Sequence, residues 1–313
     1  MARKVFDVVV NGDTFCDLVF FDCRIPDYGK ETFAKGFALS PGGAANQAVA
    51  ACRLGASVSL LSSFGKDPLG SLIRRQLEGE PGLDLSHCVT TRQQTPVTVA
   101  ITDGHDRAFA TYSEPCDSVQ WSENVPVGIA FVSLSRQLPE WALRLRSRGT
   151  LLAGNIGWDG EDEWLDKHSR ALSQIDILFI NEMEAKTYTH KDSLDEAVDA
   201  LLDYVVLVIV TRGEHGVYAA KGSQRWRVPS LPVEAVDPTG AGDVFSAACA
   251  VGLSWHWPIE DSLRLGCCVA AYSVRHPGGA ANAPSRNDMR RLLDALSLGY
   301  GDSWMRIRQW LEQ

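Results

Sequence analysis

The chain has 313 residues, 45% of them hydrophobic, which is enough for one large core or for two smaller domains. A formal net charge of −9 opposes binding to nucleic acid and to anionic membrane surfaces, because both are polyanions. The strongest apolar run, residues 204–210, is much too short to cross a bilayer as a helix.

The N-terminal segment is predicted to form a strand. Basic Arg3 and Lys4 precede an apolar run at 8–10, but Asp7 and Asn11 interrupt the run before it reaches signal-peptide length. The eight cysteines form no CxxC pair and have no histidine at zinc-ligand spacing, so we expect free thiols. Free thiols suit a reducing compartment, and the sequence therefore predicts a cytoplasmic protein.

Short apolar runs alternate with longer helix-compatible segments along the chain. The runs are rich in Val, Ile and Leu at successive positions, which is typical of strands buried on both faces of a parallel sheet. This rhythm predicts an α/β layered fold, with strands at 6–10, 58–62, 129–134, 150–153, 177–180 and 205–210.

Two segments depart from this rhythm. Residues 15–40 mix aromatic and polar residues, and residues 95–113 alternate around a turn-like Asp-Gly-His-Asp at 103–106. We expect a small antiparallel sheet outside the main core, with an ordinary surface hairpin as the alternative.

The C-terminal segment places Trp304, Ile307, Trp310 and Leu311 at spacings of three and four residues. Such spacing puts them on one stripe of a short helix. The stripe is expected to pack on its own domain or, alternatively, to form a dimer contact.

The most informative segment is Asp-Pro-Thr-Gly-Ala-Gly-Asp at 237–243, followed by an alanine-rich apolar stretch. Pro and three small residues predict a tight turn that opens a buried helix, with the amides of Gly240, Ala241 and Gly242 pointing outward. A helix N-terminus attracts anions, so a phosphoryl group could bind there. Asp243 in the first turn should be ionised, either as a catalytic group or as a simple helix cap.

This segment resembles the C-terminal motif of the ribokinase-like, or PfkB-type, sugar and nucleoside kinases. Four further segments match the family in order: the Gly-Gly turn and small-residue helix at 42–55, and the shorter motifs at 65–70, 181–184 and 211–216. The resemblance implies a three-layer sandwich with a central, mostly parallel sheet, one kinase domain over residues 1–313, and a β-sheet lid near 14–40 and 95–113.

The resemblance implies a sugar site under the lid. Asp17, placed at the end of the first strand, would accept hydrogen bonds from two sugar hydroxyls, which suits an acceptor-only carboxylate. Gly42, Gly43 and Asn46 would line the same pocket. Asp243 would be the catalytic base, with residues 240–242 as the anion hole.

The nucleotide and metal sites are likewise implied by the family. ATP would lie beside Thr211, Gly213 and Gly216. Asn181 and Glu184 would help to hold Mg²⁺, partly through water, because Mg²⁺ prefers oxygen ligands and retains its waters. Glu182 is the alternative acid nearby.

A monovalent cation site is implied at Asp237 and Thr239, with K⁺ as the candidate ion. The loop at 278–285 that completes this site in the family carries extra residues here, which leaves its ligands open. Phe15 stands where ribokinases carry a polar sugar-contacting residue, so ribose itself is an uncertain substrate.

The sequence thus predicts ATP-dependent phosphorylation of a primary sugar hydroxyl. A nucleoside kinase is the alternative, followed by an inactive sensor that binds sugar and nucleotide. A P-loop NTPase and a dinucleotide-dependent enzyme are excluded by the lack of GxxxxGK[ST] and GxGxxG. A homodimer is possible, and the sequence does not decide it.

Overall fold

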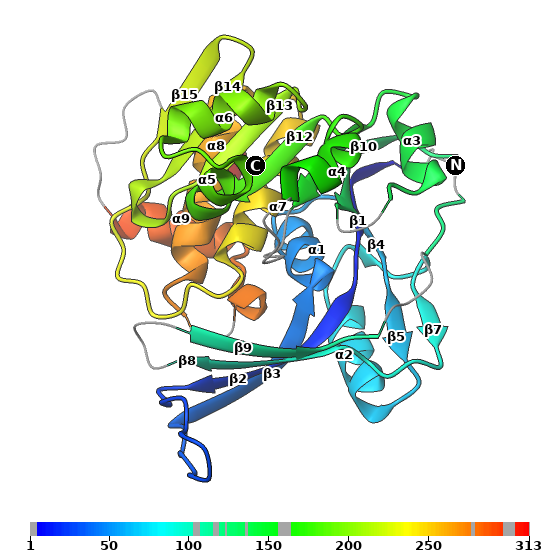
Figure 1. Cartoon of the computed structure of the whole chain (residues 1–313), viewed down its shortest axis with the longest axis vertical. Coiled ribbons are helices and arrows are strands. Elements are labelled where there is room, and N and C mark those ends of the chain that lie inside the picture. Colours follow the sequence, from blue (N-terminus) through cyan, green and yellow to red (C-terminus); the bar gives the residue numbers. More distant parts are fainter. Residues whose placement is uncertain are drawn as a thin grey trace.

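A nine-stranded sheet forms the centre of the molecule in the computed structural model (Figure 1), which describes residues 5–102, 107–114, 119–122, 124–134, 137–155, 164–276, 279–296 and 304–312. The strand order is β15-β14-β13-β12-β11-β10-β1-β4-β6. The strands are β1 Phe6–Asn11, β4 Val58–Leu61, β6 Leu83–Asp84, β10 Val127–Ser133, β11 Leu151–Asn155, β12 Ile177–Asn181, β13 Leu207–Thr211, β14 Val217–Lys221 and β15 Gln224–Val228.

The pairings from β13 to β6 are parallel, whereas β14 and β15 extend the sheet as an antiparallel edge. All six strands predicted from the apolar runs are present, with ends shifted by one or two residues. The mostly parallel sheet predicted from these runs is confirmed.

Helices cover both faces of this sheet, as expected for strands that are apolar on both sides. Side chains that alternate along the strands, such as Val8 and Val9, enter two separate hydrophobic clusters. One cluster joins the sheet to α1 (Ala44–Arg53), α2 (Pro68–Glu78), α7 (Ala241–Ser254), α8 (Ile259–Ser273), α9 (Arg286–Ala295) and α10 (Met305–Glu312). The other joins it to α3 (Glu140–Arg146), α4 (Trp164–Leu172), α5 (Glu182–Thr189) and α6 (Leu194–Leu202).

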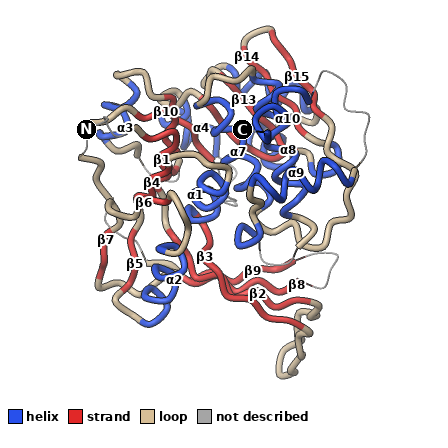
Figure 2. The backbone as a smooth tube through the Cα atoms, turned by 180° about the vertical axis from the view of Figure 1, so that it is seen from behind, coloured by secondary structure: helices blue, strands red, loops and turns tan. Residues whose placement is uncertain are grey.

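A second sheet lies outside these layers, and both views show it beneath the main body (Figures 1 and 2). Its order is β3-β2-β8-β9, with strands β2 Thr14–Phe21, β3 Gly36–Gly43, β8 Val97–Thr102 and β9 Arg107–Tyr112. The two predicted segments therefore form a four-stranded lid rather than a surface hairpin. The turn at 103–106 lies outside the described residues.

The lid is a mixed sheet, which corrects the expectation of an antiparallel one. β2 pairs antiparallel with β3, and β8 with β9, but β2 pairs parallel with β8. The reason is that β2 and β8 come from two distant segments, which a tight turn does not connect. Local alternation within each segment carries no information on how the two segments pair.

The remaining elements are short. Strands β5 (Ser63–Gly65) and β7 (Val89–Thr91) form a two-stranded sheet, and η1 (Gly213–His215) and η2 (Gly279–Asn282) are 3₁₀ turns. Within the described parts of the chain, no helix is long and apolar enough to cross a membrane. Seven cysteines are described, and all are free.

The C-terminal helix α10 packs on its own domain. Ile307, Trp310 and Leu311 are each 6% exposed or less and belong to the same hydrophobic cluster as α1 and α7. This burial confirms the first of the two interpretations of the apolar stripe.

Candidate active site

Asp243 lies in the first turn of α7, directly after the turn that begins the helix. The helix is capped by Gly240, whose φ of 72° is in the left-handed region that favours glycine. An added side chain at Gly242 would meet nothing within 4 Å, so there is open space beside the turn. The sequence prediction of a glycine turn that opens a helix, with Asp243 in the first helical turn, is therefore confirmed.

The Asp243 carboxylate is held by the neighbouring helix α1. The amide Nδ2 of Asn46 donates a hydrogen bond to Oδ2 of Asp243 at 2.9 Å, across 197 residues of sequence. Burial raises the pKa of Asp243 to about 6, and the bond from Asn46 limits the rise because it favours the ionised form. A carboxyl group with such a pKa is poised to exchange a proton near neutral pH.

Asp17 approaches the same place from the lid. It lies in the middle of β2, not at the end of the first strand as the sequence predicted, because residues 12–13 already turn the chain into the lid. Burial and the negative charge of Asp243 raise the pKa of Asp17 to about 7. The carboxyl groups of Asp17 and Asp243 therefore interact, and the charge of Asp243 affects the pKa of Asp17.

Glycines let the lid strand β3 pass closely over these groups. A Cβ atom on Gly42 would lie 1.9 Å from Oδ2 of Asp17, so only glycine fits against that carboxylate. Gly43 has a φ of 62°, and its Cβ would lie 2.6 Å from Cδ2 of Phe15. Phe15 thus packs on the turn that leads into α1.

A buried polar network lies behind Asp243, and the sequence analysis did not predict it. Ser246, which is fully buried, donates from its Oγ to the backbone carbonyl of Asp243 at 2.9 Å. The same Oγ accepts from Nε2 of Gln47 at 3.0 Å and from Nδ2 of Asn155 at 3.4 Å. These bonds fix the first turn of α7 to α1 and to the end of β11.

Asn155 could have been found from the sequence because it follows a buried apolar run. Polar residues that end parallel strands meet at one edge of the sheet, which is where ligands bind in such folds. Its Oδ1 atom is buried without a hydrogen-bond partner among the described residues. Ser246 carried no comparable signal, since it stands among small residues within a helix.

The structure corrects one detail of the turn at 237–242. The amide of Ala241 donates to the carbonyl of Pro238 at 3.2 Å and closes the turn, so it does not point outward as the sequence predicted. The amide of Thr239 donates to Oδ1 of Asp237 at 2.9 Å, and the Asp237 side chain is buried. The amides of Gly240 and Gly242 remain as candidate donors to an anion, and the space beside Gly242 is open.

Asn181 and Glu184 lie together at the start of α5, just after β12. The amide of Glu184 donates to Oδ1 of Asn181 at 2.8 Å, and the amide of Asn181 donates to Oε2 of Glu184 at 3.1 Å. This reciprocal capping box accounts for the Asn-x-x-Glu spacing in structural terms. Burial raises the pKa of Glu184.

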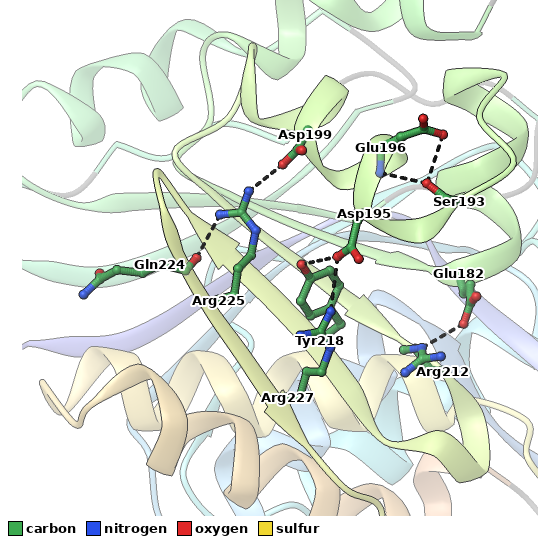
Figure 3. Close-up of polar contacts among 10 residues, drawn as sticks. All are labelled: Glu182, Ser193, Asp195, Glu196, Asp199, Arg212, Tyr218, Gln224, Arg225 and Arg227. Atoms are coloured by element: carbon green, nitrogen blue, oxygen red, sulfur yellow. Dashed lines mark hydrogen bonds and ion pairs between the residues drawn. The ribbon is translucent and has the colours of Figure 1, made fainter.

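Glu182, the alternative acid nearby, is engaged in two ion pairs. Its carboxylate pairs with Nζ of Lys186 and with Nε of Arg212, each at 2.8 Å. The pair with Arg212 links α5 to the loop after β13 (Figure 3). Hydrogen bonds from these two cations lower the pKa of Glu182.

The segment after β13 contains Thr211, Gly213 and Gly216. Gly213 has a φ of 56° and faces open space, whereas a Cβ on Gly216 would lie 2.1 Å from the carbonyl oxygen of Val228. Gly216 is therefore required by the close approach of the strand β15. Next to this loop, Oδ1 of Asp195 accepts bonds from Tyr218 and Arg227, which fasten α6 to the edge of the sheet (Figure 3).

The loop at 278–285 is described from Gly279 onward. Its η2 turn is held by Arg53 at the end of α1, whose Nη1 donates to the carbonyls of Ala281 and Ala283 at 2.8 and 2.9 Å. Arg53 also pairs with Glu80. In the described part of the chain, no cluster of three or more His, Cys, Asp or Glu residues could hold a metal ion by itself.

The chain has relatives among known protein families and solved structures. Residues 5–286 match the pfkB family carbohydrate kinase model. The chain belongs to the pfkB family of carbohydrate kinases. This kinase is 29% identical over 309 residues to the ribokinase of Bacillus subtilis, covering 92% of this chain and 99% of that protein. It is 28% identical over 298 residues to the nucleoside kinase of Methanothermobacter thermautotrophicus, covering 90% and 94%.

Among solved structures, the kinase resembles Arabidopsis thaliana ribokinase complexed with ribose and ATP. The TM-score is 0.77 at 24% sequence identity, over 93% of this chain and 99% of that one, which establishes the shared fold. The family assignment and the predicted ribokinase-like fold are both confirmed. The predicted class of enzyme, a phosphotransferase with an alcohol acceptor, follows from the family.

Proposed function

We propose that this kinase transfers the γ-phosphoryl group of ATP to a primary hydroxyl of a sugar, with Asp243 as the base. The observation that carries this proposal is the position of Asp243 in the first turn of α7, beside the open space at Gly242 and bonded to Asn46 at 2.9 Å. The Bacillus subtilis ribokinase supports a sugar as the acceptor.

In this mechanism Asp243 accepts the proton of the sugar hydroxyl as the oxygen–phosphorus bond forms. Phosphoryl transfer has a loose transition state, so positioning and charge stabilisation supply most of the rate, and proton acceptance supplies the rest. The pKa of Asp243 near 6 keeps the carboxylate largely ionised at neutral pH while leaving it basic enough to take the proton. Asn46 orients the carboxylate through its bond to Oδ2, and Ser246 fixes the backbone of Asp243 through its carbonyl.

The amides of Gly240 and Gly242 are the proposed anion hole. They stand at the N-terminus of a 14-residue helix, where unpaired N–H groups and the helix dipole favour negative charge. The third predicted member, Ala241, contributes by closing the turn through Pro238. A phosphoryl group at this turn would lie next to Asp243.

Asp17 is proposed to bind the sugar. The Asp17 carboxylate can accept hydrogen bonds from two hydroxyls. Gly42, which passes close to this carboxylate, has no side chain that would compete with the sugar. Gly43 and Asn46 complete the pocket at the junction of β3 and α1. Because the pKa of Asp17 is about 7, hydroxyl donors would also favour its ionised form and lower that pKa on binding.

The nucleotide is proposed to lie beside Thr211, Gly213 and Gly216, since Gly213 faces open space at the carboxyl edge of the sheet. ATP requires Mg²⁺ to offset its phosphate charge. Asn181 and Glu184 fit an ion held through water, because the capping box engages one oxygen of each side chain and a carboxylate has further lone pairs.

A monovalent cation such as K⁺ is proposed at Asp237 and Thr239. The buried carboxylate of Asp237 and the carbonyls of this turn provide oxygen ligands directly before the anion hole. The carbonyls of Ala281 and Ala283 are engaged by Arg53, so the cation would take its other ligands elsewhere.

A nucleoside is the second candidate substrate. The aromatic ring of Phe15 against Gly43 favours an apolar group in the acceptor pocket, and one relative is a nucleoside kinase. ADP release measured by a coupled assay across sugars and nucleosides distinguishes the two. If none of the tested acceptors causes ADP release, the kinase proposal is contradicted and a sensor that binds without turnover is favoured.

A homodimer through the lid is also proposed. Phe37 and Tyr112, which the strand register places on the same face of the lid, are 58% and 45% exposed, which is high for aromatic side chains. Light scattering should give about twice the monomer mass for the wild-type protein and the monomer mass for Phe37→Glu. A monomeric wild-type protein would contradict this arrangement.

A further inference from the structure

A cavity lies at the far end of the two helices that begin at the candidate active site. Its volume is about 350 Å³, and its walls come from the residues after α1 and α7 and from α9 and α10. The 14 residues of α7 span about 21 Å, which separates this cavity from Asp243. Its lining residues are Leu54, Gly55, Trp255, Trp257, Arg286, Arg306, Gln309 and Trp310.

Three tryptophans form one wall of this cavity, here called the tryptophan pocket. The rings of Trp255 and Trp257 are 5.7 Å apart, and Trp310 lies 5.9 and 6.0 Å from them. Trp255 and Trp257 remain partly exposed. Such a wall offers broad planar surfaces on which a flat ring can stack.

Arginines give another part of the pocket lining a positive charge. The guanidinium of Arg286 lies over the ring of Trp310 at 4.7 Å. No carboxylate pairs with Arg286 in the part of the chain that the structure describes. Arg306 pairs with Asp261 at 2.8 Å, and Asp261 is shared with Arg264. The pocket is therefore cationic on a protein whose net charge is −9.

We propose that the tryptophan pocket binds a small planar ring that carries a phosphate or carboxylate group. The ring would stack on Trp255 or Trp257, which are partly exposed, and the anionic group would pair with Arg286, whose fork of N–H donors matches both anions. A volume of about 350 Å³ lies at the low end of small-molecule sites, which suits one ring system with its charged group.

The docking of α10 explains part of the arginine arrangement but not the pocket. Arg286 donates to the carbonyl of Trp310, and Arg290 donates to the carbonyl of Leu311, so both cap the C-terminus of α10. Only Arg286 also lines the pocket. Arg290 is therefore a matched control for the loss of a helix cap.

The test uses 1-naphthyl phosphate as the probe and uncharged 1-naphthol as its control. Saturating non-hydrolysable ATP analogue and Mg²⁺ block the proposed nucleotide site. Calorimetry gives the affinity, and the indole N–H signals of the nine tryptophans report where the probe binds. We expect saturable binding of the phosphate, shifts at Trp255, Trp257 and Trp310, and at least about tenfold weaker binding of naphthol, the effect of one charged hydrogen-bonded contact.

Three variants test whether Arg286 contacts the anionic group of the probe. Arg286→Gln should weaken binding about tenfold or more, and Arg290→Gln should change it less than about twofold. Gln309→Glu adds a negative charge to an exposed lining residue without removing a core contact, so it should weaken binding even if Arg286→Gln disturbs α10. Equal affinity for both probes, equal effects of Arg286→Gln and Arg290→Gln with no effect of Gln309→Glu, or shifts only at other tryptophans would overturn the proposal.

Discussion

Replacing Asn46 by alanine should move the pH dependence of the kinase reaction. Asn46 donates to Oδ2 of Asp243 at 2.9 Å and is 7% exposed, so the bond is largely shielded from water. A hydrogen bond to a charged group is worth about 1.5–3 kcal/mol, and one pKa unit corresponds to about 1.4 kcal/mol. Loss of the bond should therefore raise the pKa of Asp243 from about 6 by roughly one to two units, with the lower figure expected if water enters.

The direction of the effect follows from the role of the base. Asp243 must be ionised to accept a proton, so activity falls as the pH falls through its pKa. In the wild-type protein the acid limb of kcat/KM should lie near pH 6 to 7, because Asp17, with a pKa of about 7, titrates beside it. In Asn46→Ala the limb should move upward by about one unit.

The assay is kcat/KM of the best acceptor from pH 5 to 9, with ionic strength held constant. Gln47→Ala is the matched control, because Gln47 is the adjacent buried amide and donates to Ser246 rather than to the Asp243 carboxylate. A change in KM at all pH values would reflect the proposed contact of Asn46 with the sugar. An acid limb that stays in place in Asn46→Ala, or moves equally in both variants, would refute the reasoning.

Three further outcomes are expected. Asp17→Ala should raise the KM of the acceptor at least about tenfold and change nucleotide affinity little, because it leaves two buried hydroxyls unpaired; an unchanged KM contradicts the sugar-carboxylate assignment. Gly42→Ala should raise the same KM, since its Cβ would lie 1.9 Å from Asp17, whereas Gly36→Ala in the same strand, which meets only Phe21 at 3.2 Å, should not; equal effects would contradict the close-packing argument. Turnover with K⁺ should exceed turnover with a bulky organic cation at equal ionic strength, and equal rates would remove the cation site at Asp237.

Much of the fold could be predicted because it depends on local patterns. The apolar runs located six strands of the main sheet, and the glycine turn located the start of α7, with Asp243 in its first turn. The direction of the β2–β8 pairing could not be predicted, since it depends on how two distant segments meet. Asp17 was placed one strand too early because β1 and β2 follow each other with only a short turn between them.

The sequence suggested the residues of the candidate site but not the bonds among them. The contact between Asn46 and Asp243 joins residues 197 positions apart, and no spacing rule reports it. The Ser246 network and the amide bond of Ala241 depend on side-chain and backbone positions that only the folded chain fixes. The Asn-x-x-Glu motif at 181–184 has a local reason, the capping box, which the spacing alone also indicates.

The measurement that most directly tests the central proposal is the turnover of Asp243→Asn. Asparagine keeps the shape of the side chain and caps a helix about as well as aspartate, but it cannot accept the proton. The proposed mechanism predicts a decrease in kcat of about a hundredfold to ten-thousandfold, with nucleotide affinity and melting temperature close to those of the wild-type protein. Near-normal turnover in the folded variant would contradict the assignment of Asp243 as the catalytic base.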